Sequence, residues 1–132
     1  TAQQRSGLAG AFYAAREWEE ARSLCLDLHR EDPASVDVLG RLGTIAARLG
    51  EEAEARRIEA ELATLERPYL WGSHTHWRSH IAGFLGEKDR AVALLREAWG
   101  QGWRLGSEIH TDMDVEALEG HPAFEELRRP IM

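Results

Sequence analysis

Three histidines between His74 and His80 form one group of side chains whose spacing could support chemistry. His76 and His80 are four residues apart, so on a helix both rings would project from one face, as zinc ligands do. A third ligand would have to come from His74, His110 or a carboxylate. Closed zinc sites usually take four protein ligands, and no HExxH motif supplies a metalloprotease base. We therefore predict no metal site and expect these histidines to line a groove or to pack, with a metal-binding sensor or enzyme as the alternative.

Cys25 is the single cysteine of the chain and would be a nucleophile only beside a base. His29, one helical turn further on, shares its helix face. Nothing nearby supplies an orienting acid or a recognisable oxyanion hole, so a small core residue is the preferred interpretation. A lone cysteine forms no internal disulfide, and no nucleotide-binding glycine motif, nucleophile elbow or catalytic carboxylate cluster is present. The sequence predicts a protein that is not an enzyme and that needs no cofactor.

Two arginines offer a different chemistry, the binding of carboxylates. Arg41 and Arg48 are seven residues apart, or two helical turns, and share a helix face. Arginine pairs with a carboxylate through two parallel hydrogen bonds, so an acidic segment is a suitable ligand. The chain itself is acidic, with a formal net charge of -7, which argues against nucleic acid as a partner. No apolar run approaches membrane-spanning length, so no membrane partner is expected either.

A recurrence in the sequence indicates the elements that would position these side chains. Residues of matching size recur at an offset of 34, as in Leu8 and Leu42, Ala21 and Ala55, and Leu28 and Leu62. A third copy follows at an offset of 36, as in Ala55 and Ala91 or Gly50 and Gly86. Each copy contains two stretches with helical spacing of apolar residues, ended by proline or glycine. One helical hairpin cannot bury both of its apolar faces, so neighbouring hairpins are expected to stack, with small residues where helices approach closely.

At these residues the chain resembles the tetratricopeptide repeat (TPR) family, which has a 34-residue period of large and small residues. The matching residues in the three copies are Leu8, Ala9, Phe12, Trp18, Ala21, Leu28 and Pro33; Leu42, Gly43, Ala46, Gly50, Ala55 and Leu62; and Ala82, Gly86, Ala91, Leu95 and Ala98. The third copy departs where Arg78 and Ser79 replace the usual Leu-Gly pair. The resemblance implies one all-α domain, a right-handed α-α superhelix of about three hairpins (2–35, 36–69 and 70–102) with a C-terminal capping helix in 103–132. The stretch 118–127 looks like the ending of such repeats in bacterial multidomain proteins.

The family also implies a concave groove lined by the first helix of each hairpin. In that register the groove residues are Gln3, Ser6, Tyr13, Asp37, Arg41, Thr44, Arg48, His76 and His80. The family's clamp for chaperone tails uses Asn and Lys, but this chain has no Asn and Lys88 is its one Lys. Any peptide would therefore have to be bound differently, by an acidic or C-terminal carboxylate on the arginines.

The function expected from this resemblance is that of a protein-protein interaction or scaffold module within a larger protein. Its partner would be a protein or peptide segment, acidic if the arginines bind it. Self-association into a homo-oligomer through the ends of the stack is the alternative. The lone thiol and the absence of a signal-peptide pattern favour a cytoplasmic location.

Overall fold

The computed structural model describes residues 1–104 and 113–129, and within these ranges the chain is helical and contains no β-strand. The prediction of an all-α fold is therefore confirmed. Its elements are α1 (Ala2–Ala14), α2 (Trp18–Glu31), α3 (Val36–Arg48), α4 (Glu52–Ala63), α5 (Ser73–Phe84), α6 (Lys88–Gly100), the 3-10 helix η2 (Met113–Leu118) and α7 (Pro122–Leu127). Residues 105–112 and 130–132 of the predicted cap lie outside the described residues.

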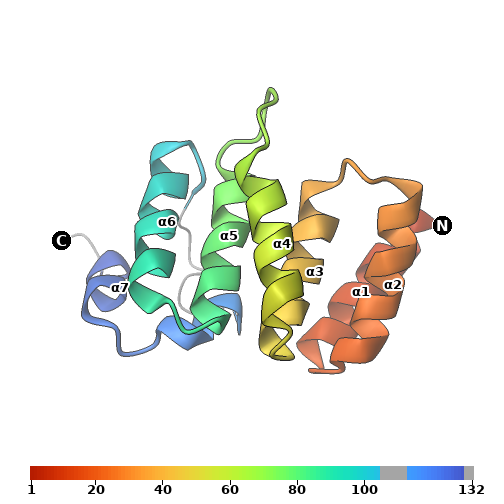
Figure 1. Cartoon of the computed structure of the whole chain (residues 1–132), viewed down its shortest axis with the longest axis horizontal. Helices are drawn as coiled ribbons and strands as arrows, with labels where there is room; N and C mark the ends of the chain where they lie inside the picture. The colour runs from red at the N-terminus through yellow and green to blue at the C-terminus, as the bar shows by residue number, and fades with distance from the viewer. Residues whose placement is uncertain (105–112, 130–132) are drawn as a thin grey trace.

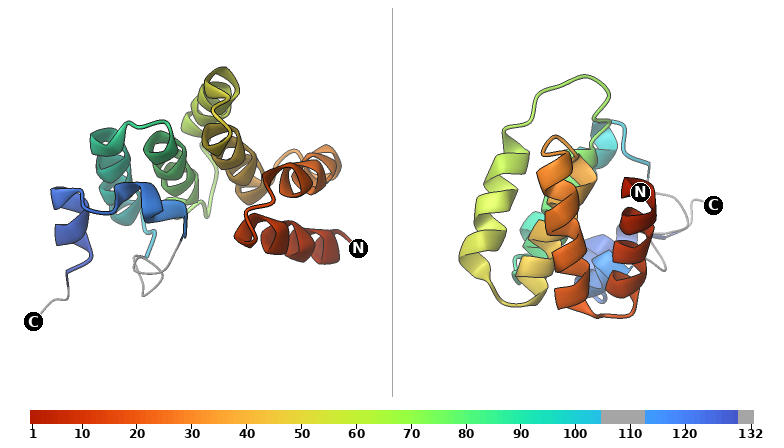
Figure 2. Two further views of the ribbon diagram at one scale, coloured as in Figure 1. Left: turned by 90° about the horizontal axis from the view of Figure 1, so that it is seen from below. Right: turned by 90° about the vertical axis from the view of Figure 1, so that its right-hand side faces the viewer.

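Consecutive helices pack against each other as hairpins. α1 packs on α2, α3 on α4 and α5 on α6, while α3 and α5 join neighbouring hairpins. The hairpins follow one another along the long axis, from α1 and α2 at one end to α6 and α7 at the other (Figure 1). Seen from below, they lie along an arc (Figure 2, left). This arrangement is compatible with an α-helical repeat solenoid, whereas its superhelical hand and its assignment to the TPR family stay predictions.

Local sequence explains where several of these helices begin and end. Thr1 and Gln4 form a capping box at the start of α1, and the Ser35 side chain accepts a hydrogen bond from the Val38 amide at the start of α3. Gly50 follows α3 with φ +76°, the left-handed conformation expected of a glycine that stops a helix. Gly86 does the same after α5, with φ +88°. The turns are therefore set by the residues within them.

Two glycines of α3 allow this helix to approach its neighbours closely. A Cβ atom added to Gly40 would lie 2.1 Å from Cγ of Trp77 on α5. One added to Gly43 would lie 2.5 Å from Cδ1 of Ile81 and 2.8 Å from Cγ2 of Ile58. These distances are far below van der Waals contact, so neither position accepts a side chain unless the facing side chains on α5 or α4 shift. The expectation of small residues where helices approach closely agrees with this packing at Gly43 and at Gly40.

Gly40→Ala is expected to lower the free energy of unfolding by about 1–3 kcal/mol, because the added methyl overlaps the Trp77 ring. Gly7→Ala in α1 is the matched control, because nothing lies within 4 Å of its added Cβ. There the alanine should stabilise the helix by up to about 1 kcal/mol. Urea unfolding of the two variants measures the difference, and equal stability for both would contradict the close packing of α3 on α5.

The C-terminal elements cover the last hairpin. η2 packs on α5 and α6, and its Val115 and Leu118 are buried together with Phe124 of α7. Burial of these apolar residues closes the end of the stack, as a capping element does. Trp99 of α6, which its place in the helical pattern predicts to be a packing residue, is instead 49% exposed. None of the helices in the described part of the chain is both long and apolar enough to cross a bilayer.

Candidate peptide-binding groove

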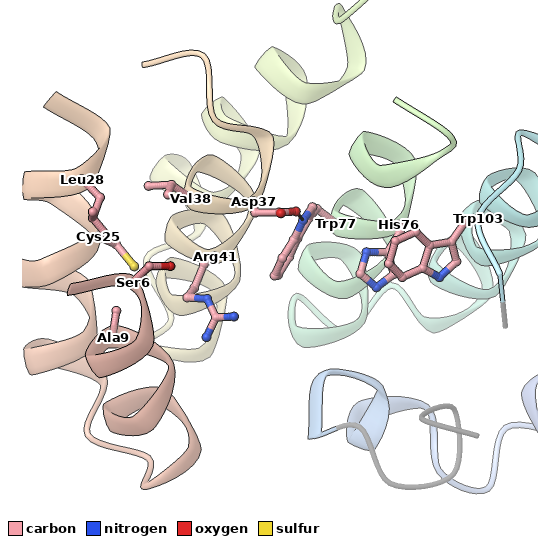
Figure 3. Close-up of a pocket in the computed structure, with 10 residues that line it drawn as sticks. All are labelled: Ser6, Ala9, Cys25, Leu28, Asp37, Val38, Arg41, His76, Trp77 and Trp103. Carbon is pink, nitrogen blue, oxygen red and sulfur yellow. Dashed lines mark hydrogen bonds between the residues drawn. The ribbon is translucent and has the colours of Figure 1, made fainter. Parts of the chain in front are cut away.

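A pocket of about 290 Å³ opens between α1, α2, α3 and α5 (Figure 3). Its lining residues are Ser6, Ala9, Cys25, Leu28, Asp37, Val38, Arg41, His76, Trp77 and Trp103. Four predicted groove residues are in this set, namely Ser6, Asp37, Arg41 and His76. Gln3 lies in an adjoining pocket of about 250 Å³ between α1, α2 and the start of α3. We call this open region the Arg41 half of the groove.

Arg41 is held in this half by aromatic rings. Its guanidinium carbon lies 5.0 Å from the ring centre of Tyr13 and 5.9 Å from that of Trp77. Cation–π contacts of this kind orient a guanidinium while leaving its N–H groups able to donate. The Arg41 charge acts to lower the pKa of Asp114, but Arg41 forms no ion pair with a residue that the structure describes. Arg41 is therefore positioned to bind an anion that comes from elsewhere.

Asp37 fixes the other wall of the pocket. The Trp77 indole N–H donates to Asp37 Oδ1 at 3.0 Å, and the Ser73 hydroxyl donates to the same oxygen at 3.5 Å. The Trp103 ring stacks on the His76 ring with a centroid distance of 3.8 Å. In Figure 3 Arg41 and Asp37 project from α3 between the apolar residues of α1 and α2 and the rings of Trp77 and Trp103. The pocket thus joins one cation and one carboxylate to apolar walls.

The other end of the predicted groove is filled by η2. Arg48 donates from Nε to Tyr13 Oη at 2.9 Å, from Nη1 to Glu116 at 2.7 Å and from Nη2 to the Met113 carbonyl at 2.9 Å. The Tyr13 hydroxyl in turn donates to Asp114. Arg48 is 6% exposed at its side chain and its guanidinium carbon lies 3.9 Å from the Phe84 ring centre. We call this region the Arg48 half of the groove.

The charges in the Arg48 half are strongly coupled. Hydrogen bonds from Arg16 and Arg48 lower the pKa of Glu116 to about 2. Burial raises the pKa of Asp114, against the opposing effects of Tyr13 and Arg48. Burial and the Asp114 charge also raise the pKa of Tyr13, so its hydroxyl stays a donor. Since the folded pKa of Glu116 is depressed, its contribution to stability is present above its ordinary pKa of 4.5 and is lost as the pH falls toward 2.

His76 and His80 face each other inside the protein, and His80, unlike His76, does not line the Arg41 half of the groove. Their Nε2 atoms are 2.6 Å apart, and His80 is 2% exposed. Burial is the main cause that lowers the pKa of His76 to about 2 and that of His80 to about 3. Metal-binding groups of three or more His, Cys, Asp or Glu side chains are absent from the described residues. His110, the other histidine considered as a third ligand, lies outside the described residues.

Thr44 and Cys25 are buried residues with a packing role. Thr44 is fully buried and its hydroxyl donates to the Gly40 carbonyl at 2.9 Å, so it does not line the groove. This corrects its assignment to the groove surface. Burial raises the pKa of the Cys25 thiol, which is the opposite of what an activated nucleophile needs. Cys25 forms part of the apolar pocket wall, in keeping with its interpretation as a small core residue.

Some groove residues are ones that sequence reasoning missed. Val38, Trp77 and Trp103 line the Arg41 half, and Asp114 and Glu116 fill the Arg48 half. The two acids stand two residues apart, and this spacing was the available signal for a ligand of the arginines. Comparisons of the chain with protein-family models, curated proteins and solved structures give no match.

Proposed function

We propose that this chain is a helical-repeat protein-interaction module of the TPR type, whose groove binds a carboxylate-bearing peptide segment of a partner protein. The observation that carries the proposal is Arg41, which Tyr13 and Trp77 orient in an open pocket and which forms no ion pair with a described residue. Arginine in such a setting recognises carboxylates through paired hydrogen bonds. The apolar walls formed by Leu28 and Val38 would receive a neighbouring apolar side chain of the same peptide.

The metal-binding alternative receives no support from the histidine geometry. The two Nε2 atoms that would bind a metal lie at hydrogen-bond distance from each other and are shielded from solvent. An ion between them would require both rings to move apart. We therefore keep the interaction module as the single proposed function.

A peptide array tests the proposal. Arrayed peptides with and without Asp and Glu residues are probed with the whole chain and with its Arg41→Gln variant. Acidic peptides should bind, and loss of a charged hydrogen bond worth about 1.5–3 kcal/mol should weaken binding about tenfold to a hundredfold. Arg30→Gln is the matched control, because Arg30 is exposed on α2 and pairs with Asp27 of the same helix. An equal loss in both variants, or no preference for acidic peptides, would contradict the proposal.

A further inference from the structure

η2 meets the rest of the protein with two different sides. Its apolar residues Val115 and Leu118 are 4% and 2% exposed and belong to the core beneath α6 and α7. Its acidic residues Asp114 and Glu116 contact Tyr13 of α1 and Arg48 of α3 instead. η2 lies beside α5 on the inner side of the arc (Figure 2, left). The apolar side of η2 covers the last hairpin. The acidic side contacts the first two hairpins, α1–α2 and α3–α4.

The acidic side is held as a bound peptide would be held. Arg48 contacts both the backbone carbonyl of Met113 and the side chain of Glu116, so the same guanidinium fixes the position and the direction of the segment. Arg16 adds two hydrogen bonds to Glu116, at 2.9 and 2.7 Å. The partners are separated by 65 to 101 residues in the chain. At these separations local chain geometry does not impose the contacts of the acidic side.

We propose that the Arg48 half of the groove is a second peptide subsite and that Met113–Leu118 is its internal ligand. The proposal rests on the proposed function, since it assigns to the same groove a second subsite, a ligand class and a means of regulation. The ligand class is a short helical turn in which two carboxylates flank an apolar residue and a second apolar residue follows, as Asp114, Val115, Glu116 and Leu118 do. A partner segment with this pattern exchanges with η2, and until it does η2 keeps the subsite closed.

Tethering makes η2 a strong competitor. A segment linked to its own site acts at an effective concentration in the millimolar range. A free peptide of similar intrinsic affinity therefore binds weakly until the internal segment loses its charged contacts. The affinity of the free peptide then rises as the fraction of open subsite rises.

The test uses a labelled six-residue peptide with the sequence of residues 113–118, blocked at both ends, and the whole chain. Its binding is measured by fluorescence anisotropy to the natural chain and to the double variant Asp114→Asn, Glu116→Gln. The peptide should bind the double variant at least about tenfold more tightly, because the neutral internal segment competes less well. Glu119→Gln is the matched control, since Glu119 pairs with Arg128 of the cap rather than with the groove. A control peptide with Asn and Gln in place of its two acids should not bind.

Equal binding of the acidic peptide to the natural chain and to the double variant would overturn the internal-ligand proposal. If other acidic peptides still bind in an Arg41-dependent manner in that case, the proposed function is retained and only the internal-ligand proposal is rejected. If no such binding is found either, both proposals are rejected. A second measurement applies even if the double variant does not fold. Hydrogen exchange of the Val115–Leu118 amides in the natural chain should speed up as the peptide concentration rises. If the hydrogen-exchange rates of these amides did not change, the proposal that a free ligand displaces η2 would be overturned.

Discussion

Arg48→Met is expected to lower the free energy of unfolding by about 3–5 kcal/mol, the usual effect of removing one member of a buried ion-pair network. Methionine keeps most of the apolar contact with Phe84 but donates no hydrogen bond. Asp114, at 11% side-chain exposure, would keep its burial and lose the nearby guanidinium. The Met113 carbonyl and the Tyr13 hydroxyl would each lose a donor as well. The second hairpin would then lose its hydrogen bonds to η2, whereas Tyr13 and Arg16 of the first hairpin keep theirs.

Urea unfolding followed by circular dichroism measures this change. Arg30→Met, an exposed arginine paired within its own helix, is the control and should alter stability by no more than about 0.5 kcal/mol. A double-mutant cycle that combines Arg48→Met with Glu116→Gln should give a loss smaller than the sum of the two single losses, because the side chains contact each other. Strict additivity would show that Arg48 does not act through Glu116.

Lowering the pH from 7 to 5 is expected to destabilise the protein through His76 and His80. Both have folded pKa values below their ordinary value of 6.5, about 2 and about 3. Below pH 6.5 the unfolded chain therefore binds more protons than the folded chain. The contribution of these two neutral histidines to the free energy of unfolding is thus fully present above pH 6.5 and is lost progressively below it. Below pH 6.5 each histidine lowers the free energy of unfolding by about 1.4 kcal/mol for each pH unit, which amounts to about 2 kcal/mol at pH 5.

The geometry explains why the folded pair resists protonation. Both rings are buried, which disfavours their charged forms, and with 2.6 Å between the two Nε2 atoms a charge on His80 also disfavours one on His76. The Arg48 charge further lowers the pKa of His80. The carboxylate of Glu116 acts in a separate window, below pH 4.5.

Unfolding free energies at pH 7 and pH 5 provide the measurement for this second prediction. His80→Gln should reduce the difference between the two pH values, because it removes one of the titrations of the buried pair. An unchanged pH dependence in His80→Gln would mean that the acid sensitivity originates outside the buried pair.

The repeating elements of the fold could be predicted because their signals are local. Apolar residues at helical spacing select a helix, and Gly50 and Gly86 stop one by adopting a left-handed conformation within the turn itself. The offset between the copies then predicts that hairpins stack, since each leaves apolar surface uncovered. Gly43 was identifiable as a close contact for the same reason. Gly40 was not, because its need for space arises from the Trp77 ring of another hairpin.

Which of the two arginines remains accessible to a ligand was decided by tertiary structure alone. Sequence spacing places Arg41 and Arg48 on one face of α3 and makes both suitable for carboxylates, but it does not distinguish them. In the folded protein Arg41 borders an open pocket, whereas Arg48 is covered by a segment that lies 65 residues or more further along the chain. The sequence by itself determined the helices and their faces, because periodicity acts within a few turns. Which face stays open depends on how distant segments pack, and only the assembled stack of hairpins decides that.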